Sequence, residues 1–164
     1  AFLTQKDIIS GIKRERLPDA VDPPPWRWRV VWQHNYTVQE DLPAAVTDAY
    51  RAFAREEHRY AVAEDAAILT DHPRAPTPAP IDAHFVLEAD ALAEAERLLA
   101  LYRRTRAIYR FQISAMPGRG YKLNLMDVVN IAYPRWDLST GRNGRIVSIN
   151  DNATENTVEL AVFA

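Results

Sequence analysis

The sequence predicts an α+β protein, in which an N-terminal strand–helix–strand unit is followed by a long helix and an antiparallel split barrel or curved sheet of about four strands. The prediction rests on an alternating aromatic run, two stretches with helical spacing of apolar residues, and regular alternation over the C-terminal third. We expect an extended lead-in, an α/β unit that ends in a Pro-rich linker, and a helix with the C-terminal β unit: residues 1–25, 26–82 (linker 71–82) and 83–164.

The aromatic run "PPPWRWRVVWQHNYTVQ" (residues 23–39) follows the lead-in, whose prolines fit neither a helix nor a ladder. Side chains alternate between the two faces of a strand. One face therefore carries an aromatic set, and the other carries arginines. The aromatic set is a possible core or subunit-interface face: Trp26, Trp28, Trp32 and Tyr36.

Three exposed tryptophans would form an apolar patch on the order of 600 Å², as large as the largest patches on soluble monomers. We therefore expect this face to be covered, either by the chain's own helix or by another subunit. Of the two, we expect the helix, with Val46, Tyr50 and Phe53 facing the tryptophans. Arg27 and Arg29 point to the other face, which argues against a stacking platform for sugars or nucleic acids.

The segments between the aromatic strand and residue 106 alternate between helical and extended patterns. A helix is predicted over 41–57, with Asp41 as N-cap and Pro43 in the first turn. "HRYAVAED" and "AAILT" read as extended pieces, and four prolines mark 71–82 as an exposed connection. "LEADALAEAERLLALYRRTR" is predicted to be a helix with acidic residues early and arginines late, as the helix dipole favours.

From about residue 107 the apolar residues alternate in groups bounded by turn residues. "PGRGYK" and "TGRNGR" each lie between strands and read as turns that need positive φ, not as phosphate loops before a helix. The chain is predicted to end in a hairpin across "NDNATEN". The alternating groups are Tyr109, Phe111 and Ile113; Tyr121, Leu123 and Leu125; and Val129, Ile131 and Tyr133.

Composition removes several classes of function. A net charge of −2 over 164 residues gives no global field that would attract nucleic acid or an anionic membrane. The absence of cysteine excludes disulfides and thiolate chemistry. No apolar run approaches a membrane span. Because the sequence begins at Ala1 without Met, we expect it to be a domain of a longer protein.

The sequence offers no catalytic constellation. Neither G-x-S-x-G nor H-E-x-x-H occurs, and the serines lack a local base. The histidines are far apart, and none has a His or Cys two to four residues away, so a metal site would require tertiary convergence: His34, His58, His72 and His84. We predict no catalytic, cofactor-binding or metal-binding residues, and a protein that is not an enzyme.

The C-terminal run "GYKLNLMDVVNIAYPRWDLSTGRNGRIVSINDNATENTVELAVF" resembles the closing segment of phage and prophage tail proteins of the baseplate hub or tail-tip kind. Those proteins carry a "lGDvV.l.yPR.gl..Gr..rV" pattern before a final hairpin. Met126 stands where the pattern usually has Gly. "VVWQHNYTVQED" and the Ala-rich helix resemble the same group in the same order. The other matching positions are Leu125, Asp127, Val128, Val129, Tyr133, Pro134, Arg135, Leu138, Gly141 and Arg142.

The resemblance implies a structural virion component that assembles in the bacterial cytoplasm into a ring, usually a trimer, joining the tail tube to a spike or fibre. Its partners would be other tail or baseplate proteins, with no membrane, nucleic acid or cofactor involved. Two alternatives remain: a small β-barrel module that binds an oligosaccharide or oligonucleotide, and a cell-wall hydrolase fragment. The hydrolase requires two carboxyl groups about 5 to 9.5 Å apart in a cleft.

Overall fold

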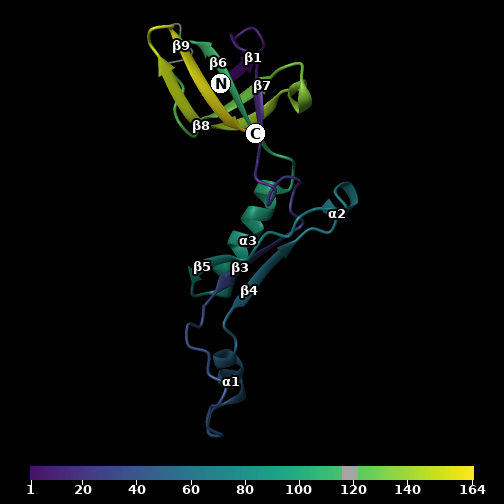
Figure 1. Cartoon of the computed structure of the whole chain (residues 1–164), viewed down its shortest axis with the longest axis vertical. Coiled ribbons are helices and arrows are strands. Elements are labelled where there is room, and N and C mark those ends of the chain that lie inside the picture. The colour runs from purple at the N-terminus through teal and green to yellow at the C-terminus, as the bar shows by residue number, and fades with distance from the viewer. Residues whose placement is uncertain (116–121) are drawn as a thin grey trace. The chain divides into compact units, whose positions relative to one another are not determined.

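The computed structural model of this chain describes residues 1–115 and 122–164 (Figure 1). The chain divides into two compact units, which we call the split unit (Ala1–Leu17 with Arg106–Ala164) and the inserted unit (Pro18–Thr105). The α-helices lie in the inserted unit, and a six-stranded, mostly antiparallel sheet forms the split unit, so the predicted α+β class is confirmed. These boundaries differ from those of the predicted parts. Most of the predicted lead-in belongs to the split unit, and the long helix predicted after residue 83 belongs to the inserted unit.

The described residues of the split unit form a curved sheet with the strand order β1-β7-β8-β9-β6-β2 (Figure 1). All neighbouring strands are antiparallel except β1, which runs parallel to β7. The strands are β1 (Phe2–Thr4), β2 (Lys13–Arg16), β6 (Ala107–Ser114), β7 (Val128–Ala132), β8 (Arg142–Asn152) and β9 (Thr157–Phe163).

Strict alternation along β6 builds the core of this sheet. Ala107, Tyr109, Phe111 and Ile113 are buried, and the residues between them are half-buried. They pack against inward-facing residues of the other strands: Leu3, Val129, Ile131, Ile146, Val158, Leu160 and Val162.

The split unit has more strands than the four or so predicted from the C-terminal sequence. The predicted lead-in supplies both edges of the sheet, because β1 pairs with β7 and β2 pairs with β6. The strand expected around Leu123 and Leu125 is wrong for the described residues, since 123–127 form turns and loop. Tyr121 and the "PGRGY" part of the expected turn lie outside the described residues.

In the inserted unit, a three-stranded sheet with the order β4-β3-β5 packs against one long helix, α3 (Figure 1). β3 (Arg27–Trp32) lies in the centre, antiparallel to β4 (Arg59–Glu64) and parallel to β5 (Ile81–Phe85). α3 (Glu88–Tyr102) matches the predicted helix and buries Ala91, Ala95 and Leu98. These residues are three and four positions apart on one helix face, and two of them are alanines that let the helix approach the sheet closely.

Two predictions for the region between β3 and β5 were wrong. The helix expected over 41–57 is only α1 (Asp48–Arg55), capped by Thr47. The Arg51 guanidinium donates hydrogen bonds to the carbonyl oxygens of Leu42, Pro43 and Val46, and so holds the preceding segment as a loop. The "AAILT" segment contains a short helix, α2 (Ile68–Asp71), in place of an extended piece.

The "TGRNGR" segment is also not the turn that was predicted. Gly141 has φ of +82°, as a turn requires, but Gly144 lies inside β8. The Pro-rich connection gives way to β5 at Ile81. Among the described residues, no helix is both long enough and apolar enough to cross a membrane.

Candidate functional site

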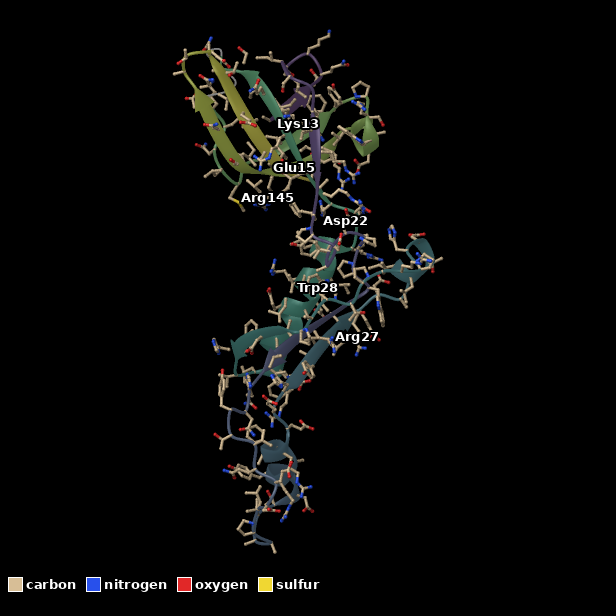
Figure 2. The ribbon with its side chains drawn as sticks, in the orientation of Figure 1. Lys13, Glu15, Asp22, Arg27, Trp28 and Arg145 are labelled. Atoms are coloured by element: carbon tan, nitrogen blue, oxygen red, sulfur yellow. The ribbon has the colours of Figure 1, made fainter. Side chains whose placement is uncertain are left out.

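The tryptophans of β3 lie in the core of the inserted unit. Trp28, which is labelled in Figure 2, is 5% exposed and packs with Ala91, Ala95 and Leu98 of α3. Its ring stacks on Tyr102 with a centroid distance of 5.5 Å. Trp32 is half-buried against the same cluster.

The helix that covers the tryptophans is α3, not the helix predicted to do so. Tyr50 and Phe53 of α1 are 54% and 39% exposed, and neither belongs to the core that contains Trp28. The loop at 42–46 shortens α1 to eight residues, so it buries only Ala54. The α1 side chains that were expected in the core are therefore left on the surface.

Trp26 and Tyr36 lie apart from this core. Trp26 is half-buried just before β3, with the Arg27 guanidinium carbon 5.8 Å from its ring centroid. Tyr36 is 73% exposed. The alternation predicted for the run stops at Gln33, where φ is +43° and the strand has ended, so Tyr36 does not continue the tryptophan face.

The arginines of β3 make their contacts away from the tryptophan core. Arg27 Nε lies 3.5 Å from Glu64 Oε2, and the Arg29 guanidinium lies 5.9 Å from the Tyr60 ring centroid. A stacking platform for nucleic acid needs cations and aromatics on one exposed face. β3 does not provide one, because its aromatic face is buried against α3.

A cluster of titratable side chains forms where β3 ends and β4 begins. Donor atoms of His34, Glu57 and His58 lie within 4.8 Å of one another, and they are the described side chains that could hold a metal ion. His34 Nε2 is 3.8 Å from Glu57 Oε1, and His58 Nδ1 is 3.7 Å from Glu57 Oε2. Asp82 of β5 adds a carboxylate oxygen 3.5 Å from His34 Nδ1.

Sequence reasoning missed this cluster, because its two histidines are separated by the α1 excursion. Asn35 N–H donates to Glu57 O at 2.9 Å, and Asn35 Nδ2 donates to Ala54 O at 2.9 Å. These bonds close the excursion at its base and bring His34 beside His58, with ring centroids 4.4 Å apart. Only the pairing of β3 with β4 could have revealed it.

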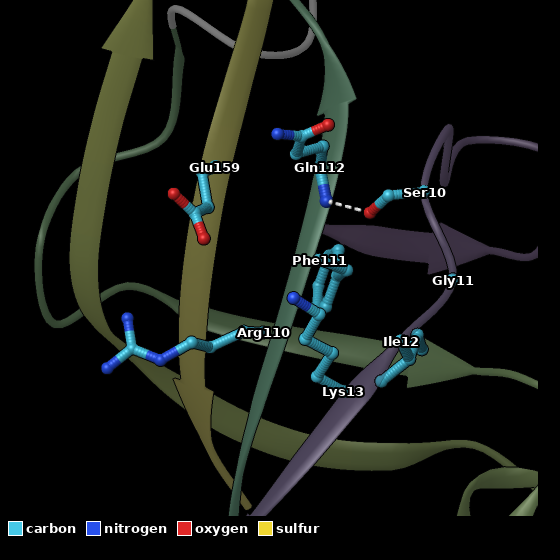
Figure 3. Close-up of a pocket in the computed structure, with 8 residues that line it drawn as sticks. All are labelled: Ser10, Gly11, Ile12, Lys13, Arg110, Phe111, Gln112 and Glu159. Carbon is cyan, nitrogen blue, oxygen red and sulfur yellow. Dashed lines mark hydrogen bonds between the residues drawn. The ribbon is translucent and has the colours of Figure 1, made fainter.

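A pocket of about 450 Å³ lies in the split unit between β2, β6 and β9 (Figure 3). Charged side chains of Lys13, Arg110 and Glu159 line it, and Arg110 Nε is also held by Glu15 at 2.7 Å. Ser10 Oγ accepts a hydrogen bond from the Gln112 N–H at 2.9 Å (Figure 3). With one carboxylate and no imidazole in its lining, this pocket supplies neither a carboxyl pair for glycoside hydrolysis nor a base for a serine nucleophile.

The resolved pKa shifts belong to a surface pair on α3. A bidentate hydrogen bond from Arg97, with both N···O distances 2.7 Å, lowers the pKa of the Glu94 carboxyl and raises that of the guanidinium. The two residues are three positions apart on one helix face. The pair stabilises the helix surface and does not point to catalysis.

No protein-family model matches this sequence, and no curated protein is found to be similar to it. The fold is similar to that of the solved 43 kDa tail protein of prophage MuSo2 from Shewanella oneidensis, with a TM-score of 0.53 and 12% sequence identity. The similarity covers 98% of this chain, and the chain spans 42% of that protein. At this level of identity, the similarity establishes the fold.

Proposed function

We propose that this chain is a non-enzymatic structural subunit of a phage or prophage tail, located in the hub or tail tip that joins the tail tube to a spike or fibre. The observation that carries the proposal is the fold, which matches a prophage tail protein over both units and nearly the whole chain. The C-terminal motif is a second support, because it rests on the residue pattern of the sequence and not on the fold.

The backbone of that motif is consistent with the resemblance. In the tail-protein pattern, glycines stand at the positions of Met126 and Gly141, and both residues have positive φ in this chain, +70° and +82°. Glycine adopts such conformations without strain. The motif thus describes two tight turns that flank β7 and open β8, and this chain retains both turns despite Met126.

A homo-oligomeric ring, with a trimer as the proposed form, gives a role to the apolar surface of α1. We define the α1 patch as Tyr50 and Phe53, which are 54% and 39% exposed and whose ring centroids lie 5.9 Å apart. Gln39 N–H donates to Ala54 O, which holds the segment before the helix against its C-terminal end. Exposed apolar groups gathered in one place mark interaction surfaces, and we propose a second copy of this chain as the occupant.

The tail proposal is tested first by the position of the gene. We expect the natural coding sequence to lie inside a block of genes for tail proteins. The protein itself would assemble into the tail in the cytoplasm of the bacterial host. A position outside any such block contradicts the tail role, whatever the oligomeric state of the protein.

The oligomer is tested by light scattering of the purified protein in solution. We expect the mass of a trimer. We expect the double substitution Tyr50→Ser/Phe53→Ser to yield monomers that still unfold cooperatively. Val147→Ser, which alters a 45% exposed residue of β8, is the matched control and should leave the trimer intact. A wild-type protein that is monomeric at all concentrations contradicts the trimer, and trimers that survive the double substitution exclude the α1 patch as their contact.

A further inference from the structure

We propose that His34, Glu57 and His58 bind a divalent transition-metal ion of the zinc type, with Asp82 orienting His34. The proposal depends on the inserted unit alone and not on the tail role. It assigns a binding site to a cluster whose members lie close together without direct hydrogen bonds: separations of 3.7 and 3.8 Å are too long for hydrogen bonds.

The spacing of the donor atoms fits one bound ion. Bonds of about 2.0–2.1 Å from zinc to nitrogen and oxygen place tetrahedral donors about 3.4 Å apart. Glu57 Oε1 lies 3.8 Å from His34 Nε2, and Glu57 Oε2 lies 3.7 Å from His58 Nδ1. One donor atom from each of the three residues lies within 4.8 Å of the other two, about an ångström beyond that separation. Small rotations of the exposed Glu57 side chain would therefore complete the geometry.

The second nitrogen of His34 provides an independent observation. Histidines that ligate metals almost always donate their other ring N–H to a carboxylate, a carbonyl or water. His34 Nδ1 is buried, makes no hydrogen bond within the described residues, and lies 3.5 Å from Asp82 Oδ1. With the ring proton on Nδ1, which faces Asp82, Nε2 on the Glu57 side keeps its lone pair for an ion.

The backbone around the cluster is held in place from several directions. Gln33, with its positive φ, donates its N–H to Phe85 O at 2.8 Å and accepts a hydrogen bond from Arg59 Nη1 at 2.9 Å. Asn35 ties the other side of His34 to Glu57 O. A site needs such supporting bonds to hold its ligands in place, and left-handed residues of this kind gather at functional sites.

The donor set selects the class of ion. Two imidazoles and one carboxylate suit zinc and its neighbours among the transition metals, whereas Ca²⁺ and Mg²⁺ require oxygen ligands. Three protein ligands leave a fourth position for water, and the exposed Glu57 gives the ion access from solvent. The bound ion would tie the end of β3 to the start of β4 and, through Asp82, to β5.

Calorimetric titration of the metal-free, untagged protein with Zn²⁺ tests the site, and the visible absorption of bound Co²⁺ reports its coordination. We expect one ion per chain, a raised unfolding temperature with Zn²⁺, and no response to Mg²⁺. His58→Ala and Glu57→Gln should each abolish or strongly weaken binding, and Asp82→Asn should weaken it about 10- to 100-fold, as typical for outer-shell partners.

His72→Ala is the matched control, because it removes one imidazole outside the cluster and should leave Zn²⁺ affinity unchanged. Glu57 and His58 are more exposed than His34, so their variants keep the test decisive if His34→Ala fails to fold. Absence of Zn²⁺ binding to the wild-type protein overturns the proposal. Binding that is equal in the wild type, His58→Ala and Glu57→Gln also overturns it, and would leave a cluster of histidine–carboxylate ion pairs.

Discussion

Met126 occupies a backbone conformation that few side chains tolerate. Its φ is +70°, in a turn where its N–H donates to Ile146 O at 2.9 Å and Asn124 N–H donates to Asp127 Oδ2 at 2.8 Å. A left-handed conformation costs an L-residue about 1–2 kcal/mol. Methionine in place of the glycine of the motif therefore strains the backbone locally, and the two hydrogen bonds hold the strained turn in place.

We expect Met126→Gly to stabilise the protein. Relief of the left-handed strain outweighs the added freedom of the unfolded chain, so the net gain should be about 0.5–1 kcal/mol. The Met126 side chain is 58% exposed, and its removal therefore loses little packing. Urea denaturation followed by circular dichroism measures the change. Gly141→Ala is the converse control and should destabilise, because φ is +82° and the new Cβ would lie 2.8 Å from Asn130 Oδ1. A Met126→Gly variant that is less stable than the wild type contradicts this account.

Trp28→Ala tests whether the tryptophan face is held by this chain's own helix. Loss of a Trp that is 5% exposed and stacked on Tyr102 should cost about 3–5 kcal/mol of unfolding free energy. Tyr36→Ala, at a 73% exposed position whose ring stacks on His34 with a centroid distance of 4.2 Å, should cost no more than about 1 kcal/mol. Tryptophan fluorescence during urea denaturation measures both. Unchanged stability of Trp28→Ala, with loss of self-association, would instead place Trp28 in a subunit contact.

The elements that could be predicted from sequence are those in which the apolar residues keep one regular spacing from the first residue to the last. β6 alternates over all its residues, and α3 presents a full apolar stripe, so both were predicted near their true bounds. α1 has a stripe of the same kind, but Arg51 bonds to three upstream carbonyls in a way that no periodicity reveals. β2, with the sequence KRER, carries no apolar signal, and its strand conformation comes from pairing with β6.

The candidate site was less predictable than the fold. Which helix covers the tryptophans depends on the packing of α3, an element that begins 56 residues after β3 ends (88 − 32). His34 and His58 become neighbours only through the β3–β4 register, and Asp82 joins them through the parallel pairing of β5. Motif spacing describes ligands within one element and does not reveal side chains that converge from separate elements.

Gly144 tests the packing of β8 against the C-terminal strand. A Cβ added at Gly144 would lie 2.6 Å from Val162 Cγ1 and 2.8 Å from Phe163 O, closer than such atoms approach. We expect Gly144→Ala to destabilise by about 1–3 kcal/mol through overpacking. Gly11→Ala is the matched control, because its Cβ would meet nothing within 4 Å, and it should be neutral or stabilise by up to about 1 kcal/mol. Equal stabilities of the two variants in urea would contradict the role given to the β8–β9 contact.

In the chain as a whole, the inserted unit occupies the position of a hairpin loop. β2 and β6 are antiparallel neighbours, and Arg16 pairs with Ala107, so the chain leaves and re-enters the split unit at adjacent points. Each unit has its own apolar core cluster. Insertion of one domain into an exposed turn of another is the arrangement that leaves both able to fold by themselves.

Removal of the insertion should therefore leave the split unit folded. Replacing residues 17–106 by Asn-Gly, the preferred two-residue turn, would connect Arg16 to its partner Ala107 through that turn and make β2 and β6 a continuous hairpin. We expect this shortened protein to show cooperative thermal unfolding and dispersed amide resonances in NMR spectra, because its core residues from Leu3 to Val162 are all retained. Residues 18–105 expressed alone should fold as well, with Trp28 still shielded from a fluorescence quencher by α3. Replacement of the same segment by two prolines is the control: the chain is then equally short but cannot form the primed turn, and it should be less stable. If neither isolated unit unfolds cooperatively while the intact chain does, the two cores are not independent, and the boundary between the units is a division of contacts and not of stability.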